Sequence, residues 1–599
     1  SARGRYDSEE GCAIAFEDWW WCRWTAVTGT SDTPLVFSYG PQGARIVSIM
    51  ASGAVIHRRR HSGLGAVART FAAAERLSCG LFPADSNVTV DVALLADRVA
   101  EIQGCVISRC RITIYATSAA TGCRQQQQDA NASSSHGAAG ACLLAVTVSE
   151  SVISDSSVIV FVTQNDMAVV IRVTDSVVHA TRAMPAGVFE GTILVDFWDG
   201  GNSQTVTNLV SALTVAIARN CSRVLSYDGV VRNSTLVAIG TMDEAAASVA
   251  ASALSVLFVD MASRRVLRVS WNISNSTITA LHSGTLSGNE AMALTIGGQV
   301  DLVTADVSSR STITASSQQS QSHVLTVGGF VRNATRVNLS GESALIATSV
   351  TKAAAVLRYR GTWLDVCSNV TVLLEGASTI MAMSDVFVAY ALVFHPAVET
   401  FDIAISDGSS ILALSRSNST TGNALAVFFE QRVWDGNLEV SGQSRLLASA
   451  NASSQGGSFT VSAVRFGGPV RNVSVDISRG GAVTATAGSA SSAVAVTFGA
   501  SEGEYHEVSV QVRGRGTRVV AVAERVYAQA VMMLRSAGTG VANDVVISVA
   551  DGARVEARVD RGGSFSPAAA VLFQGMACRN LTVSVSGNAT VVATAPGQV

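Results

Sequence analysis

Two segments, GGFVRNATRVNLSGESALIA (residues 328–347) and GGPVRNVSVDISRGGAVTATA (residues 467–487), carry nearly the same pattern within one chain. In each, apolar residues alternate with polar ones, as at Val473, Val475 and Ile477, and a glycine-containing turn leads into a second alternating run. Alternation with a period of two predicts β-strands. The pattern therefore predicts a strand, turn and strand unit that the chain uses repeatedly.

The glycine of this turn recurs through the C-terminal half at intervals of 32 to 38 residues, at Gly341, Gly376, Gly408, Gly442, Gly480, Gly514, Gly552 and Gly587. A third apolar run, such as residues 353–359 or 493–498, precedes the next unit. Three short strands per repeat without helical periodicity are typical of one coil of a β-solenoid. We predict an all-β fold, a right-handed parallel β-helix with coils of about 35 residues, in which the glycines occupy corners of positive φ.

The repeat also defines the expected domains. It is clearest in residues 230–599 and fainter back to residue 85, so we expect a solenoid over residues 85–599. Residues 1–84 form a separate N-terminal segment rich in Trp and Cys, including Trp19, Trp20, Trp21 and Cys22, whose fold the pattern does not define. This segment is interpreted as a disulfide-braced cap or preceding module, with an aromatic carbohydrate-binding surface as the alternative.

The composition limits the classes of function. Apolar residues make up 48% of the chain, mainly Ala and Val, and charged residues only 15%, which predicts a narrow core of small side chains along the whole length. The net charge of −3 gives no indication of a nucleic-acid partner or of binding to an anionic membrane surface. No run of 18 apolar residues occurs, and the start at Ser1 without a leader leads us to expect a fragment of a larger chain.

Cysteines concentrate at the N-terminal end. Seven of the ten lie before residue 143, and no Cys-x-x-Cys pair occurs. Disulfides are therefore expected there in preference to a metal site, and disulfides imply an oxidising compartment.

N-glycosylation sequons are unusually frequent. Of 21 Asn residues, 14 lie in Asn-x-Ser/Thr, where about five would be expected by composition. They are Asn87, Asn131, Asn220, Asn233, Asn272, Asn275, Asn333, Asn338, Asn369, Asn418, Asn451, Asn472, Asn580 and Asn588. The excess predicts glycosylation of a secreted chain, and the alternative is that Asn merely supplies a turn before a β-branched strand residue.

The positions of several sequons suggest a pattern on the folded chain. Asn233, Asn333, Asn369, Asn472 and Asn580 are expected at the start of the first strand of a coil, aligned as one stripe. Asn418 and Asn451 are expected in the loop after the second strand.

Candidate catalytic residues are few. Asp407 and Asp551 share a turn position but lie four repeats apart, roughly 19 Å along the stack, too far to cooperate. The pairs Asp402 with Asp407 and Asp196 with Asp199 are interpreted as solvated residues within one coil. The densest cluster is Glu502, Glu504, His506 and Glu507. No catalytic residue, cofactor or metal is expected.

The units written as Gly-Gly-x-Val-Arg-Asn-x-Thr-x-Val, with Ala/Val/Arg-rich coils and many sequons, resemble the large trypanosomatid surface proteins of the dispersed gene family, type one. The resemblance concerns repeat style over residues 230–599. It implies a β-helical ectodomain on the extracellular face of the cell surface, made through the secretory pathway. The implied function is a non-catalytic adhesive or coat rod that contacts host matrix proteins or glycans, with membrane attachment through parts of the parent chain outside this sequence. The alternative is a pectate-lyase-like polysaccharide lyase or glycoside hydrolase, which would need acidic residues in register on consecutive coils.

Overall fold

The computed structural model of the chain describes most of residues 142–596, with gaps mainly between strands, and separate strands before residue 142. Every regular element in this described part is a β-strand. It therefore contains no helix long and apolar enough to cross a membrane.

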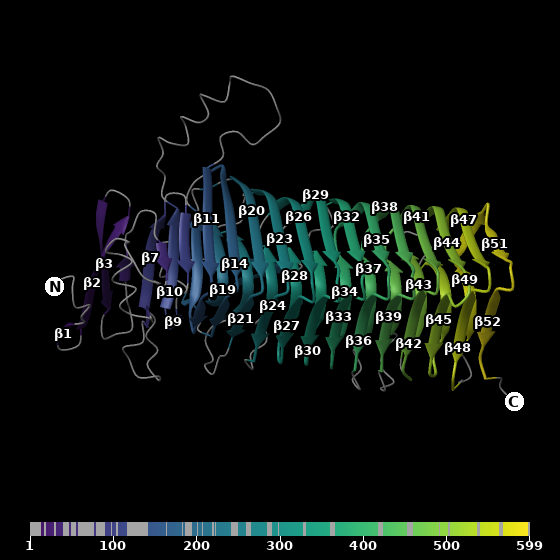
Figure 1. Cartoon of the computed structure of the whole chain (residues 1–599). Helices are drawn as coiled ribbons and strands as arrows, with labels where there is room; N and C mark the ends of the chain where they lie inside the picture. The colour runs from purple at the N-terminus through teal and green to yellow at the C-terminus, as the bar shows by residue number, and fades with distance from the viewer. Residues whose placement is uncertain are drawn as a thin grey trace, which may run out of the picture.

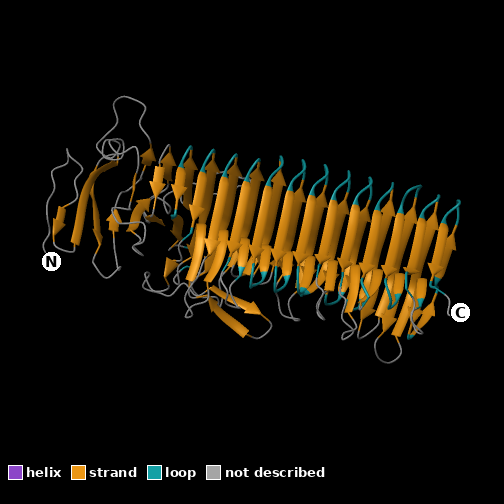
Figure 2. Ribbon diagram, turned by 90° about the horizontal axis from the view of Figure 1, so that it is seen from below, coloured by secondary structure: helices purple, strands orange, loops and turns teal. Residues whose placement is uncertain are grey.

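The strands stack in parallel to form a rod, along which they follow one another in sequence order (Figures 1 and 2). Each coil contributes a strand to sheet B, then to sheet C, then to sheet A. For example, β23 (Arg265–Ser274) leads into β24 (Thr277–His282) and β25 (Ala291–Ile296), and β26 (Gln299–Ser308) then pairs with β23. The predicted parallel β-solenoid is confirmed.

Sheet B contains β8 (Val99–Gln103), β11 (Cys142–Ser149), β14 (Met167–Thr174), β20 (Arg223–Arg232), β23, β26, β29 (Val331–Leu339), β32 (Val366–Leu374), β35 (Ala397–Ile405), β38 (Val433–Val440), β41 (Val470–Ser478), β44 (Glu504–Arg513), β47 (Gly540–Ala550), β50 (Met576–Arg579) and β51 (Thr582–Val585). Sheet C contains β9 (Val106–Ser108), β12 (Val152–Ser154), β15 (Val177–Ala180), β21 (Thr235–Gly240), β24, β27 (Thr312–Ser317), β30 (Ala344–Ser349), β33 (Thr379–Ser384), β36 (Ser410–Ser415), β39 (Arg445–Ala450), β42 (Ala482–Ala487), β45 (Arg518–Ala523), β48 (Arg554–Val559) and β52 (Thr590–Thr594). Sheet A contains β7 (Val90–Ala96), β10 (Cys110–Ala116), β13 (Ser157–Val162), β19 (Asn208–Ile217), β22 (Val249–Phe258), β25, β28 (Ser322–Val327), β31 (Ala354–Tyr359), β34 (Val388–Phe394), β37 (Asn423–Phe429), β40 (Phe459–Phe466), β43 (Ser491–Ala500), β46 (Ala528–Arg535) and β49 (Ala568–Gln574).

Shorter strands complete the pairing. Near the N-terminus, β5 (Val55–His57) and β6 (Leu77–Ser78) pair in parallel with β8 and β9, whereas β1 (Ile14–Phe16), β2 (Trp19–Thr28), β3 (Ser31–Tyr39) and β4 (Val47–Ile49) pair antiparallel in sequence order. Within the rod, β16 (Met184–Pro185) pairs antiparallel with β19, and β17 (Val195–Asp199) forms a hairpin with β18 (Asn202–Val206). The domain boundary expected at residue 84 stays a prediction.

Side chains of equivalent positions stack along the rod because the parallel strands pair in register. In sheets B and C, buried and solvent-facing residues alternate, as in β24 and β27. The inward-facing aliphatic residues of all three sheets join into one continuous core. Each coil adds roughly 4.8 Å to the length of the rod. Side chains at one register position on neighbouring coils therefore lie in van der Waals contact.

The core also contains an aromatic ladder, which the prediction of a core of small side chains did not include. Tyr359, Phe394, Phe429, Phe466 and Phe498 occupy one inward position on successive strands of sheet A. Their rings stack at centroid distances of 5.2, 5.0, 5.2 and 4.9 Å. Offset stacking of rings is favourable at this separation, which the coil spacing itself imposes.

The corner between sheets B and C confirms the prediction for the glycines. All eight repeated glycines have positive φ. Gly442 shows why: at φ 62° its added Cβ would lie 2.8 Å from the backbone nitrogen of Asp407 in the preceding coil. The corner therefore requires a residue without a side chain, or one that tolerates the left-handed conformation.

Candidate functional site

Three sequon asparagines lie at the corner between sheets B and C. Asn233, Asn275 and Asn588 all have positive φ, between 45° and 60°, and all are exposed. Asn233 donates from Nδ2 to Oδ1 of Asp175 (3.1 Å), and Asn275 donates to Oδ1 of Asn233 (2.9 Å). Asn and Asp are the side-chain-bearing residues that best tolerate this conformation. Predicting Asn233 at the start of a first strand was wrong, because Asn233 directly follows the end of β20 and precedes β21.

A second column of sequons lies at the start of the sheet B strands, as predicted. Asn369, Asn472 and Asn580 share one register position, and Asn333 lies one residue before it. All four are exposed. Asn472 donates from Nδ2 to Asp435 (2.8 Å), and Asn580 donates to Asp544 (2.8 Å). The predicted stripe thus contains four of its five asparagines.

The remaining sequons are dispersed. Asn272 is exposed on the outer face of sheet B, where Asn338 is half-buried and bonded to Asp306. Asn451 is exposed directly after β39, as predicted. Asn87, Asn131, Asn220 and Asn418 lie outside the described residues.

The hydrogen bonds of the corner asparagines give sequons a structural role beside any glycan. An N-linked sugar is attached to the same Nδ2 atom that donates to the neighbouring coil. A glycosylated Asn keeps one N–H on Nδ2, so both roles are chemically compatible. Ser and Thr at the second position after Asn are also structural, since Thr235 and Thr277 begin the sheet C strands β21 and β24.

A ladder of buried serines follows the same corner and was not predicted. Ser151, Ser176, Ser234, Ser276, Ser311, Ser343, Ser378, Ser409 and Ser444 are each nearly or fully buried. The backbone N–H of Ser343 donates to Oγ of Ser378 (3.3 Å), whose own N–H donates to Oγ of Ser409 (3.1 Å). In six of the nine serines, the Oγ accepts the backbone N–H of the serine one coil before it and so replaces a strand partner that the turning backbone has lost. The sequence does carry a signal for this ladder, because a serine follows the left-handed residue in nine described coils.

The carboxylates considered as catalytic candidates do not come together. Asp407 and Asp551 occupy the same corner on coils four strands apart, and both are exposed. Asp402 is exposed and accepts from Asn437 (3.3 Å). The side chains of Asp196 and Asp199 lie outside the described part of the structure.

The Glu502 to Glu507 cluster is likewise spread out. Glu504 and Glu507 are exposed, Tyr505 between them points into the core, and His506 contacts Asn543 (3.2 Å). Glu502 itself is not described. Among the residues with described positions, no group of three His, Cys, Asp or Glu is arranged to hold a metal.

Three cysteines have described side chains, and none of them is in a disulfide: Cys221 and Cys367 are buried and Cys578 is exposed. Burial raises the pKa of the Cys367 thiol to about 12, which makes it unreactive. The disulfides expected before residue 143 involve side chains outside the described part of the chain.

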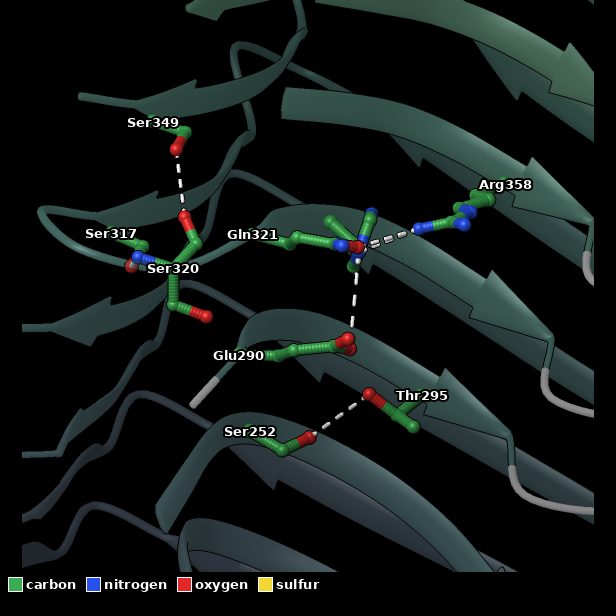
Figure 3. A network of polar contacts seen from close by, with 9 residues as sticks. Ser252, Glu290, Thr295, Ser317, Ser320, Gln321, Ser349 and Arg358 are labelled. Carbon is green, nitrogen blue, oxygen red and sulfur yellow. Dashed lines mark hydrogen bonds and ion pairs between the residues drawn. The ribbon is translucent and has the colours of Figure 1, made fainter. Parts of the chain in front are cut away.

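The outer face of sheet A carries two columns of mainly polar and aromatic side chains, interrupted by aliphatic residues such as Met292, Ala355 and Val393, and we call the polar and aromatic set the sheet A strip. It consists of Ser211, Thr214, Ser252, Ser255, Thr295, His323, Arg358, Tyr390, Phe428, Ser462, Arg465 and Thr497. Unlike the outer faces of sheets B and C, this face is fully buried at β25 and β28, and it is half-buried at Arg358, Tyr390, Phe428 and Arg465. Its hydroxyl groups bond one another, for example Ser252 with Thr295 (3.2 Å; Figure 3).

Charged groups gather in two parts of the strip. In the first, Nη1 of Arg358 donates to Oε1 of Gln321 (2.7 Å) and lies 3.3 Å from Nε2 of His323 (Figure 3). His323 is fully buried, and Oε2 of Glu290 lies 3.8 Å from its Nε2. These groups come from three successive coils, so no local sequence motif predicted that they lie together.

In the second part, Tyr390 stacks on Phe428 at 6.3 Å, and the guanidinium of Arg465 lies over the Phe428 ring at 5.5 Å. Next to them, His395 hydrogen-bonds Glu430 across adjacent coils, and this bond lowers the pKa of the Glu430 carboxyl. Glu290 and Glu430, the carboxylates at this face, flank strands β25 and β37, which are four coils apart. That is roughly 19 Å, so these two carboxylates cannot act on one bond.

Comparison with known proteins adds no relative: no family model, curated protein or solved structure matches the chain.

Proposed function

We propose that this protein is a non-catalytic surface glycoprotein, an adhesive or coat rod on the extracellular face of a cell. The observation that supports this most directly is the repetition of its outer surface. The strands of sheets B and C from β11 to β52 pair in parallel and largely in register, with shifts between β14 and β20 and between β26 and β29. A ligand with repeated groups therefore meets the same register positions on successive coils, and weak contacts add up through effective concentration.

The rod is long enough for such binding. Sheet C alone has 15 strands, which corresponds to roughly 65 Å along the axis. On the proposed function, partners are extracellular-matrix proteins or glycans. The repeat style of the dispersed gene family supports the same proposal.

Glycans are part of the proposal. Nine of the ten described sequon asparagines are exposed, and they lie on sheet B, at its corner with sheet C and after β39. The sheet A strip carries none of the ten. A rod glycosylated at these positions keeps the strip free of attached sugars.

The function is tested on the full 599-residue chain secreted from a eukaryotic host. Its binding to a panel of matrix proteins and glycans is measured while the release of reducing or unsaturated sugar is followed in the same samples. We expect binding without product. Turnover of any polysaccharide would overturn the proposal and favour the lyase or hydrolase alternative.

Glycosylation is tested by mapping peptides of the secreted chain. We expect sugar on Asn333, Asn369, Asn472 and Asn580. To remove one sequon, Ser474→Ala is the suitable variant, because it leaves the bond from Asn472 to Asp435 intact, whereas Asn472→Gln removes both bond and sequon. Unmodified asparagines at all four positions would contradict the glycan part of the proposal.

A further inference from the structure

We infer that the sheet A strip binds acidic oligosaccharides, chains that carry carboxylate or sulfate groups, at a subsite formed by Arg465, Phe428, Tyr390 and Arg358. The inference rests on the proposed function and names the ligand class for one face of the rod.

Arg465 is the first reason for an anionic ligand. Its Nε atom is buried and makes no hydrogen bond with the described residues. The nearby carboxylate, Glu430, is instead bonded to His395. Burial lowers the pKa of the Arg465 guanidinium, yet a guanidinium stays protonated in proteins. Arg465 is thus a half-buried cation whose charge partner Glu430 is already bonded to His395, and an anion bound beside it would accept from the unused Nε–H.

The aromatic rings beside Arg465 are the reason for a sugar. Tyr390 and Phe428 are half-buried and nearly parallel, with 15° between their planes. They form an aromatic platform on an outer face where polar groups are interspersed with aliphatic side chains such as Val393 and Leu425. The C–H face of a pyranose packs on aromatic rings. On the neighbouring strands, the buried hydroxyls of Ser462 and Thr497 bond each other (3.0 Å). An acidic peptide would satisfy the arginine but would not require the platform.

The spacing of the two arginines fits a polymer. Arg358, Val393, Phe428 and Arg465 occupy one outer register position on β31, β34, β37 and β40. The two guanidinium groups are thus on strands three coils apart, roughly 14 Å. The length that each sugar adds to an extended oligosaccharide is close to the spacing between coils. About one sugar therefore lies over each coil.

The test compares Arg465→Gln with Arg445→Gln, which changes an exposed arginine on the outer face of sheet C in the same coil. Binding of a chondroitin sulfate hexasaccharide to the full-length chain is measured by calorimetry, with neutral chitohexaose and hexaglutamate as competing probes. We expect Arg465→Gln and Phe428→Leu to weaken binding about tenfold or more, and Arg445→Gln to leave it unchanged. Neither chitohexaose nor hexaglutamate should bind as tightly as the chondroitin sulfate hexasaccharide.

A second readout separates a binding role from a structural one. If Arg465 serves a ligand, Arg465→Gln leaves the thermal stability of the unliganded chain unchanged or raises it. A loss of stability, or equal binding losses in the Arg465 and Arg445 variants, would overturn the inference, as would equal affinity for hexaglutamate. Binding of matrix proteins without binding of any acidic sugar would also overturn the inference, but it would remain consistent with the proposed function. Absence of binding to the whole panel would instead remove the proposed function.

Discussion

At the scale of single residues, the corner between sheets B and C explains much of the unusual composition. Its left-handed positions are most often Gly, Asn or Asp, and the buried position after them is most often Ser. Local geometry therefore accounts for the Asn in several sequons before any sugar is considered. At these positions an Asn both adopts the left-handed backbone conformation that the corner requires and adds to the number of sequons.

The serine ladder makes a testable contribution to stability. Replacing Ser378 by Ala removes the acceptor of the Ser343 N–H and leaves that donor buried, at a cost of about 1 to 3 kcal/mol. We expect faster hydrogen exchange at residue 343 and a lower melting temperature. Ser378→Thr should restore both, because Thr517 accepts the N–H of Gly480 at the same corner (2.9 Å).

The matched control for this prediction is Ser449→Ala, at a half-buried position on the outer face of β39. It should have little effect. Equal destabilisation by Ser378→Ala and Ser449→Ala would show that the ladder has no special role.

His282 should make part of the rod sensitive to pH. It ends β24, faces inward, and neither ring nitrogen has a hydrogen-bond partner among the described residues. Burial lowers its pKa, so the unfolded chain binds a proton more readily than the folded chain. Stability is therefore full above the pKa of unfolded His, near 6.5, and falls as the pH drops from there toward the lower pKa of the folded state.

The measurement is hydrogen exchange of peptides from β23 to β25 at pH 7.5 and 5.5, corrected for intrinsic exchange. His282→Ser, which introduces the residue found at the aligned position Ser317, should remove the difference. His506→Gln, at a half-buried surface position, should not. A pH dependence that persists in His282→Ser would refute this assignment.

At the scale of elements, strand type and coil length follow from sequence because period two and the recurring glycine are local signals. The aromatic ladder and the sheet A strip are not local. Phe394 and Phe429 lie 35 residues apart, and only the register of β34 with β37 places them in contact. Arg358 and His323 likewise meet through strand pairing. A repeat alignment with coils of unequal length cannot assign that register in advance.

Gly436 on β38 tests the packing of the aromatic residues. An added Cβ would lie 1.8 Å from Cε1 of Phe401, whose ring packs on Phe429 at 4.7 Å. Gly436→Ala should therefore destabilise the rod by about 3 kcal/mol, as an overpacked core does. The double variant Gly436→Ala with Phe401→Leu should recover part of this loss in denaturant unfolding.

Gly499→Ala is the control for this prediction, because its added Cβ meets nothing closer than Cγ2 of Thr497 at 3.3 Å. It should be nearly neutral. A similar loss in both variants, or no recovery in the double variant, would show that contact with Phe401 is not the cause.

At the scale of the whole molecule, each coil contacts mainly its neighbours, so stability is expected to be a sum over coils and interfaces. Deleting residues 480–515 removes β42, β43 and β44 and joins Arg479 to Gly516, two equivalent corners. We expect this variant to be secreted with an unchanged all-β circular dichroism spectrum and a melting temperature within a few degrees of the parent.

Deleting only residues 480–497 removes β42 and most of β43, which leaves the corner of one coil joined to the third strand of the same coil. This variant should fail to be secreted. Equal behaviour of the two deletions would contradict the independence of coils.

The parallel pairing of the sheets has a mechanical consequence. Hydrogen bonds between coils run along the axis of the rod, so a pull on its two ends loads them in tension, and the outermost coil yields first. Each yielding coil releases about 35 residues, or roughly 120 Å of extended chain, and the next coil then takes the load. Under force the rod is expected to unfold one coil at a time. It would lengthen in nearly equal steps before the attachment at either end breaks.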